Sequence, residues 1–278
     1  PHLRGCLPLR SRWRFRIRGA KTDRRRIVRP VGSRMIRDVL VVAWKEWREL
    51  GADEGRESGL LGLIIFVGLL GLFLPYQVGR TWLTAPWVML FWIWIPIFLM
   101  TTVTADSFAG ERERGTLGSL LATRLPDRAI LAGKISAVVV YVWGATLLSV
   151  PLSLLAINVR SPGPLAFYTP AQLATVTTLA LLASVFGAAL GVLISLRAPT
   201  VRHAQQTFSL GVLAVFVVPV FGIQLLPDAA KGGLFRLMLM GEAGRVALLL
   251  GAGLAVLDCV LLAAALARFR RGRLLLSS

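Results

Sequence analysis

The sequence contains few of the residues from which catalytic and metal sites are built. It has two cysteines, Cys6 and Cys259, and two histidines, His2 and His203. The cysteines are too far apart in sequence for a disulfide framework, and neither histidine has a cysteine or carboxylate at ligand spacing, so no metal site is predicted. The GxxxxGK[ST] phosphate loop, the HExxH zinc helix and the GxSxG elbow are all absent. We therefore expect no catalytic residues. The lack of a nucleophile–base pair also argues against an intramembrane enzyme.

Charged residues are scarce as well. They make up 17% of the chain against 55% hydrophobic residues, and the mean hydropathy is +0.68. A soluble domain cannot bury that much apolar surface, so the composition predicts an all-α integral membrane protein. The formal net charge of +18 does not indicate nucleic-acid binding, because 12 of the 32 Lys and Arg residues lie in residues 1–34.

Residues 1–34 form a basic N-terminal extension. We expect it to be disordered or to lie upstream of the true start at Met35. The alternative is a basic arm on anionic lipid headgroups. The remaining residues, 35–278, are predicted to form one transmembrane domain.

Residues 35–50 predict an amphipathic helix that lies in the plane of the membrane interface. Its apolar residues recur at i, i+3 and i+4, while most charged residues fall on the other side. The helix is too charged to span the bilayer, and its tryptophans suit the headgroup boundary. Its central residues are Trp44, Lys45, Glu46, Trp47 and Arg48.

Six apolar segments follow, each close to the 20 or so residues that cross a bilayer. They cover residues 59–76, 85–104, 135–157, 171–196, 207–226 and 244–267. With the N-terminus in the cytoplasm, the cytoplasmic segments hold 27 Lys and Arg residues and the outer segments five. The excess of positive charge predicts that both termini, and the loop 105–134, are cytoplasmic.

Few polar residues lie inside these segments. Asp258 is the one acid well within a span, and an intramembrane carboxylate is a functional candidate by default. Since no span offers a basic partner, Asp258 is either a transport residue, protonated, or hydrogen-bonded to a neighbouring helix. Gly187 and Gly191 form a GxxxG pattern, which predicts close helix packing.

The loop between the second and third segments carries an ordered pattern of charge. It reads ADSFAGERERGTLGSLLAT at residues 105–123, followed by ILAGK at residues 130–134. This pattern resembles the permease subunits of ABC transporters of the ABC-2 type. The interfacial helix and the six-segment layout extend the resemblance over about 240 residues, although only the loop motif is specific.

The resemblance implies that the loop forms a coupling helix that docks on a separate ATP-binding cassette subunit. The matching motif residues are Glu111, Arg112, Glu113, Arg114, Gly115 and Thr116, and the apolar face of the helix would consist of Leu117, Leu120 and Leu121. It further implies that ATP and Mg²⁺ bind the partner, and that this chain binds no cofactor. The competing interpretation is that the charges merely hold the second span at the membrane surface.

We therefore expect a permease subunit that pairs with a second permease chain, identical or different, in the bilayer. It would export a substrate across a membrane, most simply a prokaryotic cytoplasmic membrane. The alternatives are a haem-export-like or copper-maturation-type permease of the same architecture, and a non-transporting membrane scaffold or sensor. Nothing in the spans identifies the substrate.

Overall fold

The fold consists of helices throughout the part of the chain that the structure describes. The structure, a computed structural model, describes residues 31–52, 64–65, 67–85, 87–104, 106–116, 118–119, 122–123, 125–161, 163–233 and 243–269, and no strand occurs among them. The elements are α1 (Val31–Ala52), η1 (Leu69–Phe73), α3 (Leu74–Val78), α4 (Thr81–Thr84), α5 (Val88–Val103), α6 (Asp106–Glu113), α8 (Asp127–Arg160), α9 (Pro170–Ser195), α10 (Val201–Leu225) and α12 (Ala243–Arg268). The all-α prediction is confirmed for these residues.

Three helices are long and apolar enough to cross a membrane: α8, α9 and α12 over Gly244–Arg268. Of two shorter apolar helical stretches, Phe91–Thr101 lies within the second predicted span and Leu69–Val78 extends two residues beyond the end of the first, at residue 76. The chain is therefore an integral membrane protein, and the count of six spans remains a prediction. Residues 1–30 and 59–63 lie outside the described residues. Helix α1 begins at Val31, four residues before the predicted interfacial helix.

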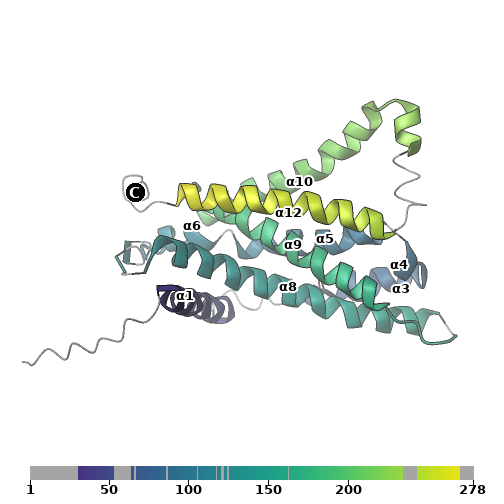
Figure 1. The fold of residues 1–278 in the computed structure, drawn as a ribbon, viewed down its shortest axis with the longest axis horizontal. Coiled ribbons are helices and arrows are strands. Elements are labelled where there is room, and N and C mark those ends of the chain that lie inside the picture. The colour runs from purple at the N-terminus through teal and green to yellow at the C-terminus, as the bar shows by residue number, and fades with distance from the viewer. Residues whose placement is uncertain are drawn as a thin grey trace, which may run out of the picture.

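Helix α8 is the central element of the bundle. It packs against α1, η1, α3, α5 and α9 (Figure 1). Its 34 residues correspond to about 51 Å at 1.5 Å per residue, whereas the hydrocarbon core of a bilayer is about 30 Å thick. The helix therefore extends beyond that core, which leaves room for polar side chains near its ends.

Small residues allow the helices to approach closely. A Cβ atom added to Gly133 of α8 would lie 2.5 Å from Val42 Cβ of α1. One added to Gly187 of α9 would lie 2.7 Å from Met100 Cγ of α5, and Gly191 lies against Thr104 in the same way. The prediction that the GxxxG pattern serves helix packing is confirmed.

Helix α10 is packed at its beginning and exposed towards its end. Its contacts are with α5, α6 and α9, and its N-terminus is capped by Thr200, whose side chain accepts a hydrogen bond from His203 N. The later residues Leu213, Val218, Phe221 and Leu225 are all exposed, and this part of the helix diverges from the bundle (Figure 1).

Candidate functional site

The charged motif lies on α6, a short helix that is held at both ends. At its start, Phe108 N and Ala109 N donate to Ser195 Oγ of α9 at 3.0 and 2.9 Å. At its end, Gly115 adopts a φ of 68°, a left-handed conformation that glycine tolerates best. Thr116 N then donates to Glu111 O, and Gly115 N donates to Arg112 O. These two bonds form the usual glycine-dependent termination of a helix.

The second part of the predicted coupling helix does not continue α6. The chain turns at Arg114–Gly115, directly after the helix ends. Arg114, Gly115 and Thr116 are exposed at this turn, as are Gly118 and Ser119 beyond it. Leu117, Leu120 and Leu121, the predicted apolar face, lie outside the described residues.

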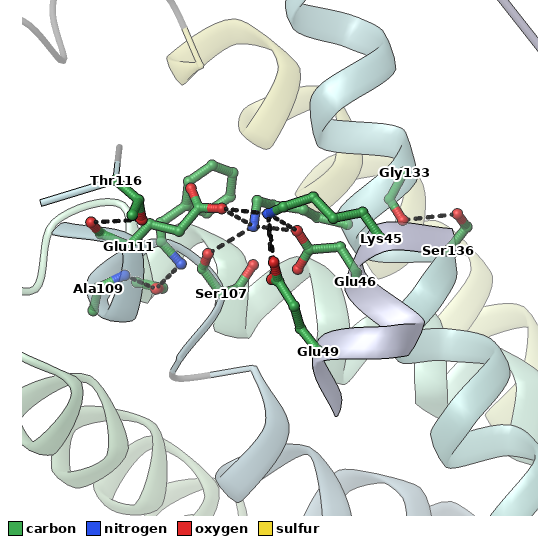
Figure 2. A network of polar contacts seen from close by, with 12 residues as sticks. Lys45, Glu46, Glu49, Ser107, Ala109, Glu111, Thr116, Gly133 and Ser136 are labelled. Carbon is green, nitrogen blue, oxygen red and sulfur yellow. Dashed lines mark hydrogen bonds and ion pairs between the residues drawn. The ribbon is translucent and has the colours of Figure 1, made fainter. Parts of the chain in front are cut away.

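Glu111, the first charged residue of the motif, points into the protein and joins a buried ionic cluster. Lys134 Nζ of α8 donates to Glu46 Oε1 of α1 at 2.8 Å and to Glu111 Oε1 at 2.9 Å (Figure 2). It also donates to Ser107 O at 2.9 Å, so all three of its donors are used. The lysine side chain is 1% exposed and the Glu111 side chain 4%. We refer to Lys134, Glu46, Glu111, Lys45 and Glu49 as the Lys134 cluster.

The outer part of the Lys134 cluster is formed by α1. Lys45 Nζ lies 3.4 Å from both Glu46 Oε1 and Glu111 Oε1, and 3.1 Å from Glu49 Oε1. Partial burial opposes the charged form of Lys45, but Glu46 and the other two carboxylates outweigh it and raise the pKa of Lys45 above its ordinary value. Lys45 therefore stays protonated, and it links the buried pair to the surface.

Arg112 and Glu113 bind the segment that connects α9 and α10. The Arg112 guanidinium donates to Leu196 O at 3.1 Å and to Ala198 O. Glu113 Oε1 accepts from Val201 N at 2.9 Å, an amide in the first turn of α10 that has no partner within its own helix. A carboxylate is favourable at this positive end of the helix.

The aromatic ring of Phe108 connects α6 to two further elements. Lys134 Nζ lies 5.1 Å from the centroid of the ring, within the range of a cation–π contact. The ring of Phe269, one residue beyond α12, lies 5.3 Å from it, centroid to centroid. Through these contacts, α6 is linked to α1, α8, α9, α10 and the end of α12.

Some of the predicted interfacial residues of α1 are exposed, and others contact the rest of the protein. Trp44 and Arg48 are exposed, and Trp47 meets Tyr141 of α8 edge to face, with centroids 6.1 Å apart. Glu46, which the sequence pattern placed on the polar side, instead turns inward and is 9% exposed. The pattern identified a helix with two faces but did not identify Lys134 as the partner of Glu46.

Sequence reasoning missed Lys134, Ser107 and Ser195 as parts of this site. Lys134 is the last residue of the ILAGK segment and lies two turns into the apolar helix α8. A lysine in that position requires a buried counter-charge, which was the available signal. The two serines gave no comparable signal in the sequence. Ser107 contributes its main-chain carbonyl, and the hydroxyl oxygen of Ser195 accepts hydrogen bonds from backbone amides.

Asp258 is buried within α12, a helix that packs on α9. Its exposed fraction is 5%, and neither carboxyl oxygen has a hydrogen-bond partner among the described residues. The expected alternative of a hydrogen bond to a neighbouring helix is therefore not found among the described residues, and a role in transport stays a prediction.

Comparison with known proteins agrees with the motif and the helices. The family described as ABC-2 family transporter protein matches residues 88–236, which is just over half of the 278 residues. This range includes α6, Lys134 and the helices α5, α8, α9 and α10. No curated protein matches the chain. The chain belongs to the ABC-2 family of membrane transporter proteins.

Proposed function

We propose that this chain is the permease subunit of an ATP-driven exporter. A separate ATP-binding cassette subunit docks on the surface formed by the end of α6 and the exposed residues that follow it, 114–116, 118–119 and 122–123. The observation that carries the proposal is the position of α6. It is hydrogen-bonded or ion-paired to four other helices, α1, α8, α9 and α10, through Lys45, Lys134, Ser195 and Glu113. A displacement of the exposed turn would therefore act on several helices together.

The contacts of the motif separate a supporting part from a docking part. Glu111 and Arg112 bond inward and are buried or half-buried, whereas residues 114–116, 118–119 and 122–123 are exposed. We infer that Glu111 and Arg112 hold α6 in place and that the exposed turn contacts the ATP-binding subunit. ATP and Mg²⁺ then belong to the partner, and this chain carries out no hydrolysis.

The substrate path is proposed to lie between two permease chains, identical or different. The exposed second half of α10 offers an apolar helical surface on which a second chain could pack within the bilayer. The direction of transport is outward, and the location is a prokaryotic cytoplasmic membrane.

The docking proposal is tested with Ala122→Arg, because Ala122 is exposed in the turn and does not belong to the Lys134 cluster. A long charged side chain there should lower co-purification with the ATP-binding subunit about tenfold or more, the effect expected of a disrupted central contact. It should also uncouple the partner's ATPase activity from the permease. Ala230→Arg is the matched control, since Ala230 is exposed near the end of α10.

Glu111→Ala is a poor test of docking, because it would also leave Lys134 buried without one of its two carboxylates. If Ala122→Arg and Ala230→Arg both leave co-purification and coupled ATPase activity unchanged, docking on this surface is wrong. The non-transporting scaffold interpretation predicts that result.

A further inference from the structure

A cavity adjoins the Lys134 cluster. It has a volume of about 590 Å³ and lies between α1, α6, the start of α8 and four residues of the connecting turn: Thr116, Ser119, Thr123 and Leu125. Its walls combine apolar residues, such as Val42 and Val138, with hydroxyl and charged side chains. This size falls within the range of small-molecule sites in proteins. Four of its lining residues also belong to the proposed docking surface: Arg114, Thr116, Ser119 and Thr123.

Two residues that line the cavity each carry a buried polar atom with no hydrogen-bond partner among the described residues: Glu111 Oε2 and Ser107 Oγ. Both residues are more than nine-tenths buried, at 3% and 8% exposure. Glu111 Oε1 faces the two lysines, and the second oxygen of the same carboxylate points away from them (Figure 2). A buried carboxylate oxygen without a partner is costly, so the site favours a ligand that donates hydrogen bonds.

Among the described residues that line the cavity, basic and acidic side chains are equal in number. Three of the lining side chains are basic and three are acidic: Lys45, Arg114, Lys134, Glu46, Glu49 and Glu111. A simple anion or cation would disturb this balance, whereas a zwitterion would preserve it. A ligand with an ammonium group near Glu111 and an acidic group near the basic side chains therefore fits best.

The wall formed by α1 indicates where such a ligand comes from. Val41 lines the cavity and is 56% exposed, and the neighbouring Leu40 and Trp44 are also exposed. This apolar surface belongs to the helix that the sequence places in the membrane interface. A ligand in the cavity can therefore keep its acyl chains beside α1 in the bilayer, with its headgroup among the charges.

We propose that this cavity binds the headgroup of a zwitterionic aminophospholipid, with its ammonium group donating hydrogen bonds to Glu111 Oε2 and Ser107 Oγ. The phosphate then lies towards Lys45, the cationic side chain of the wall that is 45% exposed. Phosphatidylethanolamine has this chemistry. Phosphatidylcholine has the same charges, but its trimethylammonium group carries no N–H donor and cannot satisfy the two atoms.

The experiment compares these two lipids with identical acyl chains on the full-length purified protein in detergent. Lipid binding is measured by native mass spectrometry and by the shift in thermal unfolding temperature. Phosphatidylethanolamine should bind about tenfold more tightly than phosphatidylcholine, as expected for a hydrogen bond to a charged group. Equal binding of the two lipids would overturn the proposal.

Ser107→Ala is the principal variant, because it removes only the hydroxyl and keeps the main-chain carbonyl that holds Lys134. It should reduce the preference for phosphatidylethanolamine at least severalfold. Ser136→Ala is the matched control, since Ser136 Oγ bonds Gly133 O and does not line the cavity. An unchanged preference in Ser107→Ala would contradict the assignment. Glu111→Gln, if it folds, should abolish the preference.

Soluble phosphoethanolamine distinguishes a lipid from a free metabolite. If phosphatidylethanolamine binds no more tightly than soluble phosphoethanolamine, the ammonium site is supported and the lipid source is overturned. These readouts require no ATP-binding subunit, so this inference and the docking proposal can fail independently.

Discussion

At the scale of single residues, Lys134 determines how the site is built. A buried ammonium group costs several kcal/mol in desolvation unless carboxylates and carbonyls replace its water. Glu46, Glu111 and the carbonyl of Ser107 provide that replacement. Their geometry requires α1, α6 and α8 to meet in one arrangement. The cluster therefore specifies how these helices associate, beyond any net stability that it adds.

Replacing Lys134 with Met should destabilise the protein strongly. The substitution leaves Glu46 and Glu111 buried near each other with only the half-exposed Lys45 between them. We expect a loss of about 3–5 kcal/mol in the free energy of unfolding, the usual effect of removing one partner from a buried ion pair. The measurement is denaturant or thermal unfolding of the purified protein in detergent.

Lys231→Met is the matched control for this prediction. Lys231 pairs with Asp228 at 3.2 Å, but their side chains are 37% and 99% exposed, and exposed pairs contribute little. The variant should unfold like the wild-type protein. If Lys134→Met is no less stable than Lys231→Met, the cluster has no structural role.

At the scale of elements, the contact between α1 and α8 depends on Gly133. Gly133→Ala would place its new methyl group 2.5 Å from Val42 Cβ and 3.0 Å from the Val39 carbonyl oxygen. Because the carbonyl belongs to the backbone, relief requires α1 to move. We expect a loss of about 1–3 kcal/mol in stability.

Gly144→Ala, in the same helix, provides the comparison. No atom lies within 4 Å of a Cβ added at Gly144, and alanine favours a helix by about 1 kcal/mol over glycine. This variant should therefore match or exceed the wild-type unfolding temperature. A Gly133→Ala protein as stable as Gly144→Ala would show that α1 is free to shift on α8.

The helices could largely be predicted from the sequence, because a run of apolar residues is a local property. Predicted segments such as 135–157 and 171–196 fall within or nearly coincide with α8 and α9. The contacts of the charged motif could not be predicted, since Glu46 and Lys134 are 88 residues apart. The resemblance implied that the motif docks on a partner, yet Glu111 and Arg112 bond within the chain. No local pattern indicates which distant segment will supply a partner.

At the scale of the whole molecule, the orientation in the membrane follows from charge and from α8. Ser119 precedes α8 and Leu165 follows it, and both are exposed. If α8 crosses the bilayer once, these two residues lie on opposite sides. The excess of Lys and Arg around the loop 105–134 predicts that Ser119 lies in the cytoplasm and Leu165 outside.

Cysteine labelling in intact cells tests this arrangement. In a background of Cys6→Ser and Cys259→Ala, a membrane-impermeant maleimide should react with Leu165→Cys at once and with Ser119→Cys only after permeabilisation. Labelling of both in intact cells would show that α8 does not separate them. The reverse labelling pattern would confirm that α8 crosses the membrane but would show the opposite orientation of the protein. Residues 114–123 could then not reach a cytoplasmic ATP-binding subunit. The docking proposal therefore depends on the orientation that this measurement decides.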